Sequence, residues 1–255
     1  MELMIQNVWL IPLFPLIAFI LLIAFGRQLK EGSAWLGTVL MLGSFVLATM
    51  TLIERLNAEQ TAPILYEWLK IGGDTLSLGD RWITMGYEVT PLNALMLFIV
   101  TLVSLLVHIY ARGYMEGDNR ISVFYSYLAL FTFAMLGLVI SPNLLQIYIF
   151  WELVGVASFL LVGFYFYKPE AKAAAKKAFI VTRIGDVGLF IGIILLFWQV
   201  GSFDLAAIFA AIENNQLEAG FITLVAILIF IGAMGKSGQF PLHTWLPDAM
   251  EGLHL

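Results

Sequence analysis

Lys236 is a charged residue inside an otherwise apolar stretch, Ile227–Met250, which two prolines, Pro241 and Pro247, then interrupt. An ammonium group in such a stretch is costly unless polar groups surround it, and ionisable residues kept there often carry protons or ions. We therefore predict that Lys236 gains and loses a proton on a broken helix, where protein or water satisfies the unwound backbone. The alternative is a lysine at a helix end that extends its ammonium to the lipid headgroups.

Three further charged residues lie inside apolar segments: Glu152, Arg183 and Asp186. Glu152 lies near the middle of Leu144–Phe166, where a charge costs about 2.5–3.5 kcal/mol. We predict that it relays protons and that it could approach Lys236 and stabilise the ammonium. The alternative is a protonated glutamic acid that joins two helices by a hydrogen bond.

Arg183 and Asp186 are three residues apart, so they share a helical face and can form a local ion pair. A purely structural salt bridge is the alternative. His108 and His243 could join a proton relay, although each could equally be a hydrogen-bonded structural histidine. A phosphate-binding loop is excluded at Lys236, because the required glycine five residues before Gly235 is replaced by Phe230.

The composition indicates the protein class. The 255 residues are 61% hydrophobic and 12% charged, with a mean hydropathy of +0.92. Several apolar runs are long enough to cross a bilayer, so we predict an all-α polytopic membrane protein. The chain has no cysteine, which excludes an iron–sulfur cluster within it. A net charge of −5 without a basic patch argues against nucleic acid as a partner.

About seven transmembrane segments are expected, with the last one discontinuous. They are Val8–Phe25, Ala34–Ile53, Pro91–Tyr110, Val123–Ile140, Leu144–Phe166, Phe179–Val200 and Phe221–Met250. With the N-terminus outside, the inner loops hold eight basic residues and the outer loops three. The positive-inside rule therefore favours an outside N-terminus.

Two elements are predicted between the spans. Alternating residues at Ile64–Ile71, a turn at Gly72–Asp74 and a second run at Thr75–Leu78 suggest a β-hairpin in the long outer loop. A plain structured loop is the alternative. Phe203–Gln216 carries apolar residues at helical spacing, which predicts a short interfacial helix.

Several motifs together resemble one family. They are Phe150–Gly155 around Glu152, Lys177–Ile180 followed by Arg183–Asp186, Gly235–Ser237 followed by His243–Met250, and the shorter runs Trp9–Pro15, His108–Tyr110 and Gly113–Met115. These motifs resemble the antiporter-like subunits of respiratory complex I, most closely the subunit called chain L in bacteria and subunit 5 in mitochondria. The resemblance extends over residues 8–252.

This resemblance implies a proton channel built from two inverted five-helix repeats after three initial helices. Residues 1–120 would be the three-helix region with the outer loop, and residues 121–255 the first, incomplete repeat. Glu152 would be the carboxylate of the first half-channel, Lys236 the lysine on the broken helix, and Arg183 and Asp186 an ion pair that relays the electrostatic state of a neighbouring subunit. The members of this family are more than twice as long, so we expect this chain to be an N-terminal half. His254 would not correspond to the histidine that the family carries on its next helix.

The resemblance also implies function and partners. The subunit would couple quinone reduction to proton pumping in a bacterial plasma membrane, beside other membrane subunits of complex I. NADH, flavin, iron–sulfur clusters and quinone would be bound by partner subunits, with no cofactor or metal bound by this chain. A subunit of a cation/proton antiporter or of an inorganic-carbon uptake system is the alternative, and a structural scaffold is a third.

Overall fold

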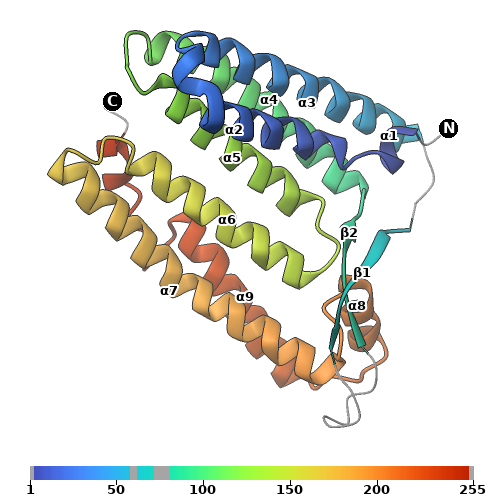
Figure 1. The fold of residues 1–255 in the computed structure, drawn as a ribbon. Helices are drawn as coiled ribbons and strands as arrows, with labels where there is room; N and C mark the ends of the chain where they lie inside the picture. The colour runs from blue at the N-terminus through green and yellow to red at the C-terminus, as the bar shows by residue number, and fades with distance from the viewer. Residues whose placement is uncertain (1–2, 58–61, 72–80, 253–255) are drawn as a thin grey trace. The chain divides into compact units, whose positions relative to one another are not determined.

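The computed structural model describes residues 3–57, 62–71 and 81–252 (Figure 1). Seven helices in these ranges are long and apolar enough to cross a membrane. They are α2 (Leu10–Leu29), α3 (Gly32–Asn57), α4 (Pro91–Tyr114), α5 (Ile121–Val139), α6 (Leu144–Val162), α7 (Pro169–Val200) and α9 (Ala219–Ser237). The predicted polytopic α-helical class is therefore confirmed.

Three short helices accompany the spans: α1 (Leu3–Gln6), α8 (Leu205–Glu213) and the 3-10 helix η1 (Asp248–Gly252). Helix α8 confirms the short helix predicted over Phe203–Gln216, with Ile208 on its buried side and Phe209 exposed. The last span is discontinuous, as predicted, because α9 ends at Ser237 and, up to residue 252, η1 is the one helix that follows it.

Helix α7 begins at Pro169, well before the predicted start at Phe179. The added turns are rich in alanine and lysine, which favour a helix but lower the hydropathy that marked the span. Proline is well tolerated in the first turn, where its missing N–H has no partner to lose. The helix ends at Val200, and the capping residue Gly201 has a φ of +78°, a left-handed conformation that glycine adopts without strain.

The chain divides into two compact units, which are described separately. The first comprises Met1–Ile64, Tyr87–Ser141 and Phe150–Leu161, and the second comprises Leu65–Gly86, Pro142–Ile149 and Val162–Leu255. In the first unit α2 packs against α3 and α5, and α3 packs against α4. Fully buried Val8, Leu97 and Leu136 belong to its apolar core. The predicted division at residue 120 concerns the repeat organisation and stays a prediction.

The two-stranded sheet joins β1 (Ile64–Ile71) to β2 (Arg81–Tyr87). The first strand confirms the prediction, and its partner is β2, at residues whose pattern predicts no strand. The predicted turn at Gly72–Asp74 and the predicted strand at Thr75–Leu78 lie outside the described residues.

In the second unit, β2 is attached to the start of α6 and to the turn before α8. Asn143 donates its amide to the carbonyl of Thr84 at 2.8 Å. Gln146 donates to the carbonyl of Gly86 and accepts from its N–H, at 2.8 and 2.9 Å. Asp204 accepts a hydrogen bond from the Thr84 hydroxyl at 2.9 Å. These bonds satisfy buried polar groups that would otherwise be costly.

Candidate functional site

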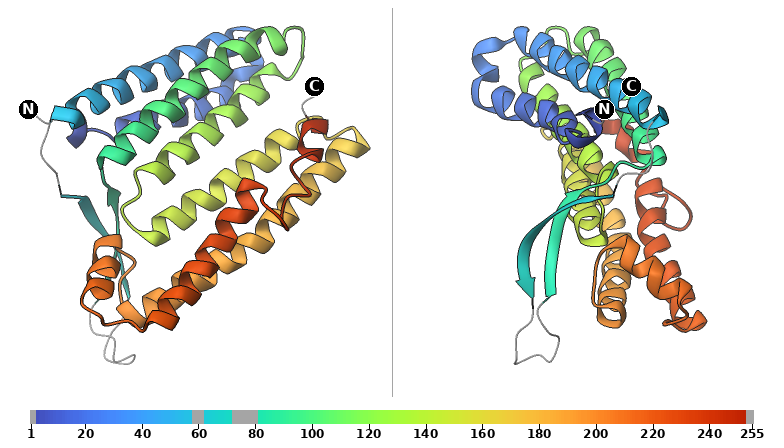
Figure 2. Two further views of the ribbon diagram at one scale, coloured as in Figure 1. Left: turned by 180° about the vertical axis from the view of Figure 1, so that it is seen from behind. Right: turned by 90° about the vertical axis from the view of Figure 1, so that its right-hand side faces the viewer.

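Helices α7 and α9 pack almost backbone to backbone, and they lie side by side in Figures 1 and 2. A Cβ added to Gly232 of α9 would lie 2.7 Å from the Cβ of Leu189 of α7, and one added to Gly185 would lie 3.0 Å from the carbonyl oxygen of Ile231. Small residues at such contacts let helix backbones approach closely in membrane proteins. The approach sets which side chains of the two helices meet.

Asp186 and Lys236 meet at this contact, with Lys236 Nζ 3.4 Å from Asp186 Oδ2. The Asp186 side chain is 1% exposed and that of Lys236 is 18% exposed. The same oxygen of Asp186 lies 3.9 Å from Arg183 Nη1, so one carboxylate faces two cations. Arg183 is more exposed, and its guanidinium also lies 4.8 Å from the centre of the Phe179 ring.

Lys236 lies in the last turn of α9, immediately before the chain leaves the helix. Gly238 adopts a left-handed φ of +61°, and the N–H of Gln239 donates to the carbonyl of Met234 at 3.0 Å. Trp245 donates its indole N–H to the carbonyl of Gly235 at 3.0 Å. The negative end of the helix dipole favours a cation at this position.

The segment after the break returns to α7. A Cβ on Gly185 would lie 3.4 Å from Leu242 Cδ1, so Leu242 covers the same glycine contact. At η1, Asp248 Oδ2 lies 2.7 Å from Lys177 Nζ, in an ion pair whose two side chains are nearly half exposed. The segment after α9 therefore contacts α7 twice, through the apolar side chain of Leu242 and through the Asp248–Lys177 ion pair.

The remaining predicted site residues lie elsewhere. Glu152 is half-buried in the middle of α6 and belongs to the first unit. There α6 packs on α5, since the Phe150 ring lies 5.7 Å from that of Phe133. Because Lys236 belongs to the second unit, the predicted approach of Glu152 to Lys236 stays a prediction.

The two histidines differ in their surroundings. His108 of α4 is 1% exposed, and its Nδ1 lies 2.8 Å from the Ser104 carbonyl oxygen, the geometry of a donated hydrogen bond. Its own carbonyl accepts a hydrogen bond from the Tyr125 hydroxyl at 2.6 Å. His243 is exposed in the segment after α9, with its ring 5.7 Å from that of Phe240.

The spacing along one helix predicts only Arg183 as the partner of Asp186, whereas the structure also brings Lys236 to the same carboxylate. A signal was present in the glycines: Gly185, Gly188 and Gly192 recur on one face of α7, and Gly232 and Gly235 recur on α9. Facing rows of this kind indicate close helix packing in membranes. Asp186 directly follows Gly185, and Lys236 directly follows Gly235. Within the described ranges, no cluster of three or more His, Asp or Glu side chains could hold a metal ion.

Two family models match the chain. The model described as "NADH:quinone oxidoreductase/Mrp antiporter, TM" matches residues 141–254, which include the whole Asp186–Lys236 site. The model described as "NADH-Ubiquinone oxidoreductase (complex I), chain 5 N-terminus" matches residues 76–125.

Curated relatives give the same family. The chain is 44% identical to the chloroplast NAD(P)H-quinone oxidoreductase subunit 5 of Mesostigma viride, over 99% of this chain and 39% of the relative. It is 43% identical to NAD(P)H-quinone oxidoreductase chain 5 of Synechocystis sp., over 99% of this chain and 38% of the relative. The chain thus spans about two fifths of the length of these relatives.

Two solved structures share the fold. A chain of the archaeal membrane-bound sulfane sulfur reductase superposes with a TM-score of 0.79 at 19% identity, over 97% of this chain and 48% of that one. A chain of the Mrp complex from Dietzia sp. superposes with a TM-score of 0.75 at 23% identity, over 94% of this chain and 25% of that one. The chain belongs to the antiporter-like membrane subunits of the NADH:quinone oxidoreductase and Mrp antiporter family, and it matches the N-terminal region of chain 5.

Proposed function

We propose that the protein is a proton-translocating membrane subunit of an NAD(P)H:quinone oxidoreductase of the complex I type. The observation that carries this proposal is the Lys236–Asp186 pair, held 3.4 Å apart where α9 unwinds. A buried cation next to an acid at a helix break is an arrangement that can hold a proton and expose it to water. The names of the curated relatives support the redox partner, because they are NAD(P)H-quinone oxidoreductase subunits.

In the proposed mechanism, Asp186 moves between its two cations. While it lies against Lys236, the carboxylate stabilises the ammonium form of the lysine. When Asp186 turns toward Arg183, which is already 3.9 Å away, Lys236 loses its counterion and burial favours the neutral amine. The released proton then leaves through the polar break. Glu152 would be the carboxylate of the same half-channel, and it would exchange protons with Lys236.

The two histidines have secondary proposed roles. His243 is exposed beside the break, where its imidazole would exchange protons with water. His108 would pass a proton within the first unit, through its ring and the Ser104 hydroxyl, whose oxygen lies 3.5 Å from Nδ1. NADH, flavin, iron–sulfur clusters and quinone would be bound by partner subunits, whose redox reaction would supply the energy.

Proton pumping by the full-length subunit in its assembled complex tests the proposal. We expect Lys236→Ala, Asp186→Asn and Glu152→Gln each to lower the number of protons pumped per electron in sealed vesicles, while the complex still assembles. Lys172→Gln, which changes an exposed lysine on α7, is the matched control. Unchanged pumping in the Lys236→Ala complex would remove the relay role.

A second candidate is a subunit of a cation/proton antiporter. It is supported by the description of the first family model, which includes the Mrp antiporter. Vesicles with a sodium gradient but without NAD(P)H or quinone discriminate between the two functions. Sodium-driven proton movement that depends on Lys236 would favour the antiporter, whereas movement that requires electron transfer favours the oxidoreductase.

We also propose an orientation within the membrane. The N-terminus would face outward, opposite the helix ends and connections that hold Arg27, Lys30, Arg112, Arg120 and the lysines at the start of α7. A bacterial plasma membrane is the proposed location, supported by the cyanobacterial relative, while other relatives are chloroplast or chromatophore proteins.

A further inference from the structure

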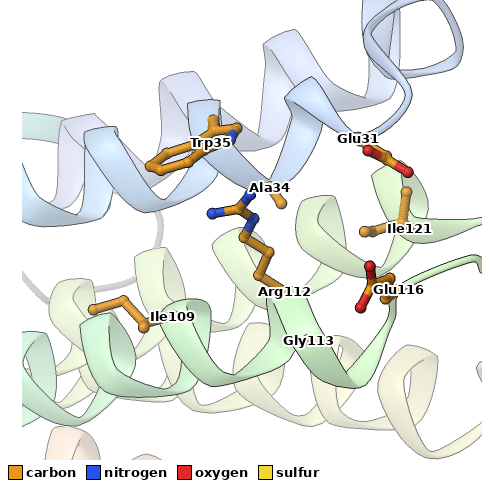
Figure 3. A pocket seen from close by; sticks show the side chains of 8 residues that line it. All are labelled: Glu31, Ala34, Trp35, Ile109, Arg112, Gly113, Glu116 and Ile121. Atoms are coloured by element: carbon orange, nitrogen blue, oxygen red, sulfur yellow. The ribbon is translucent and has the colours of Figure 1, made fainter.

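A hollow of about 350 Å³ lies in the first unit, at the ends of four membrane-length helices (Figure 3). Its walls come from the turn between α2 and α3, the first turn of α3, the last two turns of α4, the connection between α4 and α5, and the start of α5. Helix ends of this kind lie at the level of the lipid headgroups. The hollow is therefore placed where a headgroup can enter from the membrane surface.

Opposite charges are separated within the hollow. Figure 3 shows the Arg112 side chain directed from α4 toward α3, with the carboxylates of Glu31 and Glu116 toward the other end. The Arg112 guanidinium lies 4.2 Å from the centre of the Trp35 ring. In the described part of the chain, neither carboxylate is within ion-pair distance of this guanidinium. Stacking on a ring leaves the guanidinium edge available to an anion.

The apolar rim of the hollow fits a membrane ligand better than a soluble one. Trp35 and Ile109 are each more than half exposed beside the charged groups. Tryptophan is enriched at the membrane interface, where its ring packs against apolar chains and its indole N–H donates a hydrogen bond to water. A ligand that spans this hollow therefore has an anionic group, a cationic group and an acyl chain.

We propose that the hollow binds the headgroup of a zwitterionic phospholipid with a primary amine, of the phosphatidylethanolamine type. The phosphate would accept hydrogen bonds from Arg112, and the ammonium would donate to the carboxylates of Glu31 and Glu116. Two carboxylates repel an anionic headgroup, and a choline headgroup has no N–H to donate. An inorganic phosphate would use Arg112 alone.

Photo-crosslinking tests this site in the full-length subunit within its complex, without turnover. The complex is reconstituted in vesicles of equal parts phosphatidylethanolamine, phosphatidylcholine and phosphatidylglycerol, with one of the three carrying a diazirine on its acyl chain near the glycerol. Mass spectrometry then measures the yield on the peptides that contain Trp35 and Ile109. We expect the highest yield with phosphatidylethanolamine.

The variants separate the two halves of the site. Arg112→Gln should lower the yield about fivefold, the effect of one basic group near a headgroup. Glu31→Gln with Glu116→Gln should lower the phosphatidylethanolamine yield to that of phosphatidylcholine. Lys172→Gln, which changes an exposed lysine outside the hollow, should leave the crosslinking yields of phosphatidylethanolamine and phosphatidylcholine unchanged.

The proposal is overturned by equal yields in the wild-type complex and in the Glu31/Glu116 variant, by a highest yield with phosphatidylglycerol, or by loss of the crosslink with excess inorganic phosphate. The glutamate variant decides the outcome if Arg112→Gln does not assemble, since both glutamates are exposed. A hollow covered by a neighbouring subunit would give no crosslink, which also rejects the proposal.

Discussion

Gly185 of α7 and Gly235 of α9 are in backbone contact, since a Cβ on Gly235 would lie 3.3 Å from the Cα of Gly185. The next residue on each helix is a charged one, Asp186 and Lys236. The two charges meet because the residues before them have no side chains to separate the helices. The glycine contact and the ion pair are therefore one structural unit.

The glycine contact should tolerate no side chain. In Gly185→Ala the new Cβ would lie 3.0 Å from the Ile231 carbonyl oxygen and 3.1 Å from the Gly235 Cα, which are backbone atoms that cannot turn away. We expect the helices to separate, with a loss of about 1–3 kcal/mol in the free energy of unfolding. Thermal unfolding of the full-length subunit in detergent measures the change.

Gly220→Ala is the matched control for this substitution. It lies on α9, the helix that packs against α7, but a Cβ there has no heavy atom within 4 Å. Its replacement should be neutral or slightly stabilising, because alanine favours the helix. Equal melting temperatures for the Gly185 and Gly220 variants would contradict the close packing.

The Lys236–Asp186 pair should show energetic coupling. Asp186→Asn removes the counterion of a largely buried lysine, and we expect a loss of about 3 kcal/mol in the free energy of unfolding. Lys236→Met should cost less, because Arg183 remains near the same Asp186 oxygen. The loss in the free energy of unfolding of the double variant should be smaller than the sum of the two single losses by about 1–3 kcal/mol.

Chemical denaturation of the four proteins in the cycle gives this coupling energy. Additive losses, within about 0.5 kcal/mol, would mean that the two side chains do not interact in the membrane.

Gln146 should hold β2 to the start of α6. The residue is 4% exposed, and its side chain makes two reciprocal hydrogen bonds with the backbone of Gly86. Gln146→Leu leaves a backbone donor and acceptor without these partners, and we expect a cost of about 1–3 kcal/mol. Hydrogen exchange at the Gly86 amide should become faster, while the exposed Gln216→Leu should leave it unchanged. Unaltered exchange in Gln146→Leu would argue against the attachment.

The proposed orientation gives a labelling prediction. This region has no cysteine, so single cysteines can be introduced at Trp68 on β1 and at Asn119 between α4 and α5, in a protein whose other cysteines are replaced. An impermeant maleimide added outside intact cells should label Trp68→Cys and leave Asn119→Cys unlabelled, with the reverse in inverted vesicles. Labelling of Asn119→Cys but not of Trp68→Cys from outside intact cells would reject the outside N-terminus.

Local features of the fold were predictable. Hydropathy marks the spans because each must be apolar over the membrane thickness. Gly238 and Pro241 mark the end of α9 because their backbone preferences are local. Strand β2 was missed, since Arg81–Tyr87 lacks clear alternation and becomes a strand by pairing with β1.

The sequence by itself determined the membrane class, the seven spans and the position of Lys236 at a helix break, because each depends on neighbouring residues along the chain. Only the tertiary structure decided which carboxylate faces Lys236. Asp186 and Lys236 lie on different helices, and the register between helices depends on how their glycine faces fit together. Hydropathy and spacing within one helix carry no information on that register.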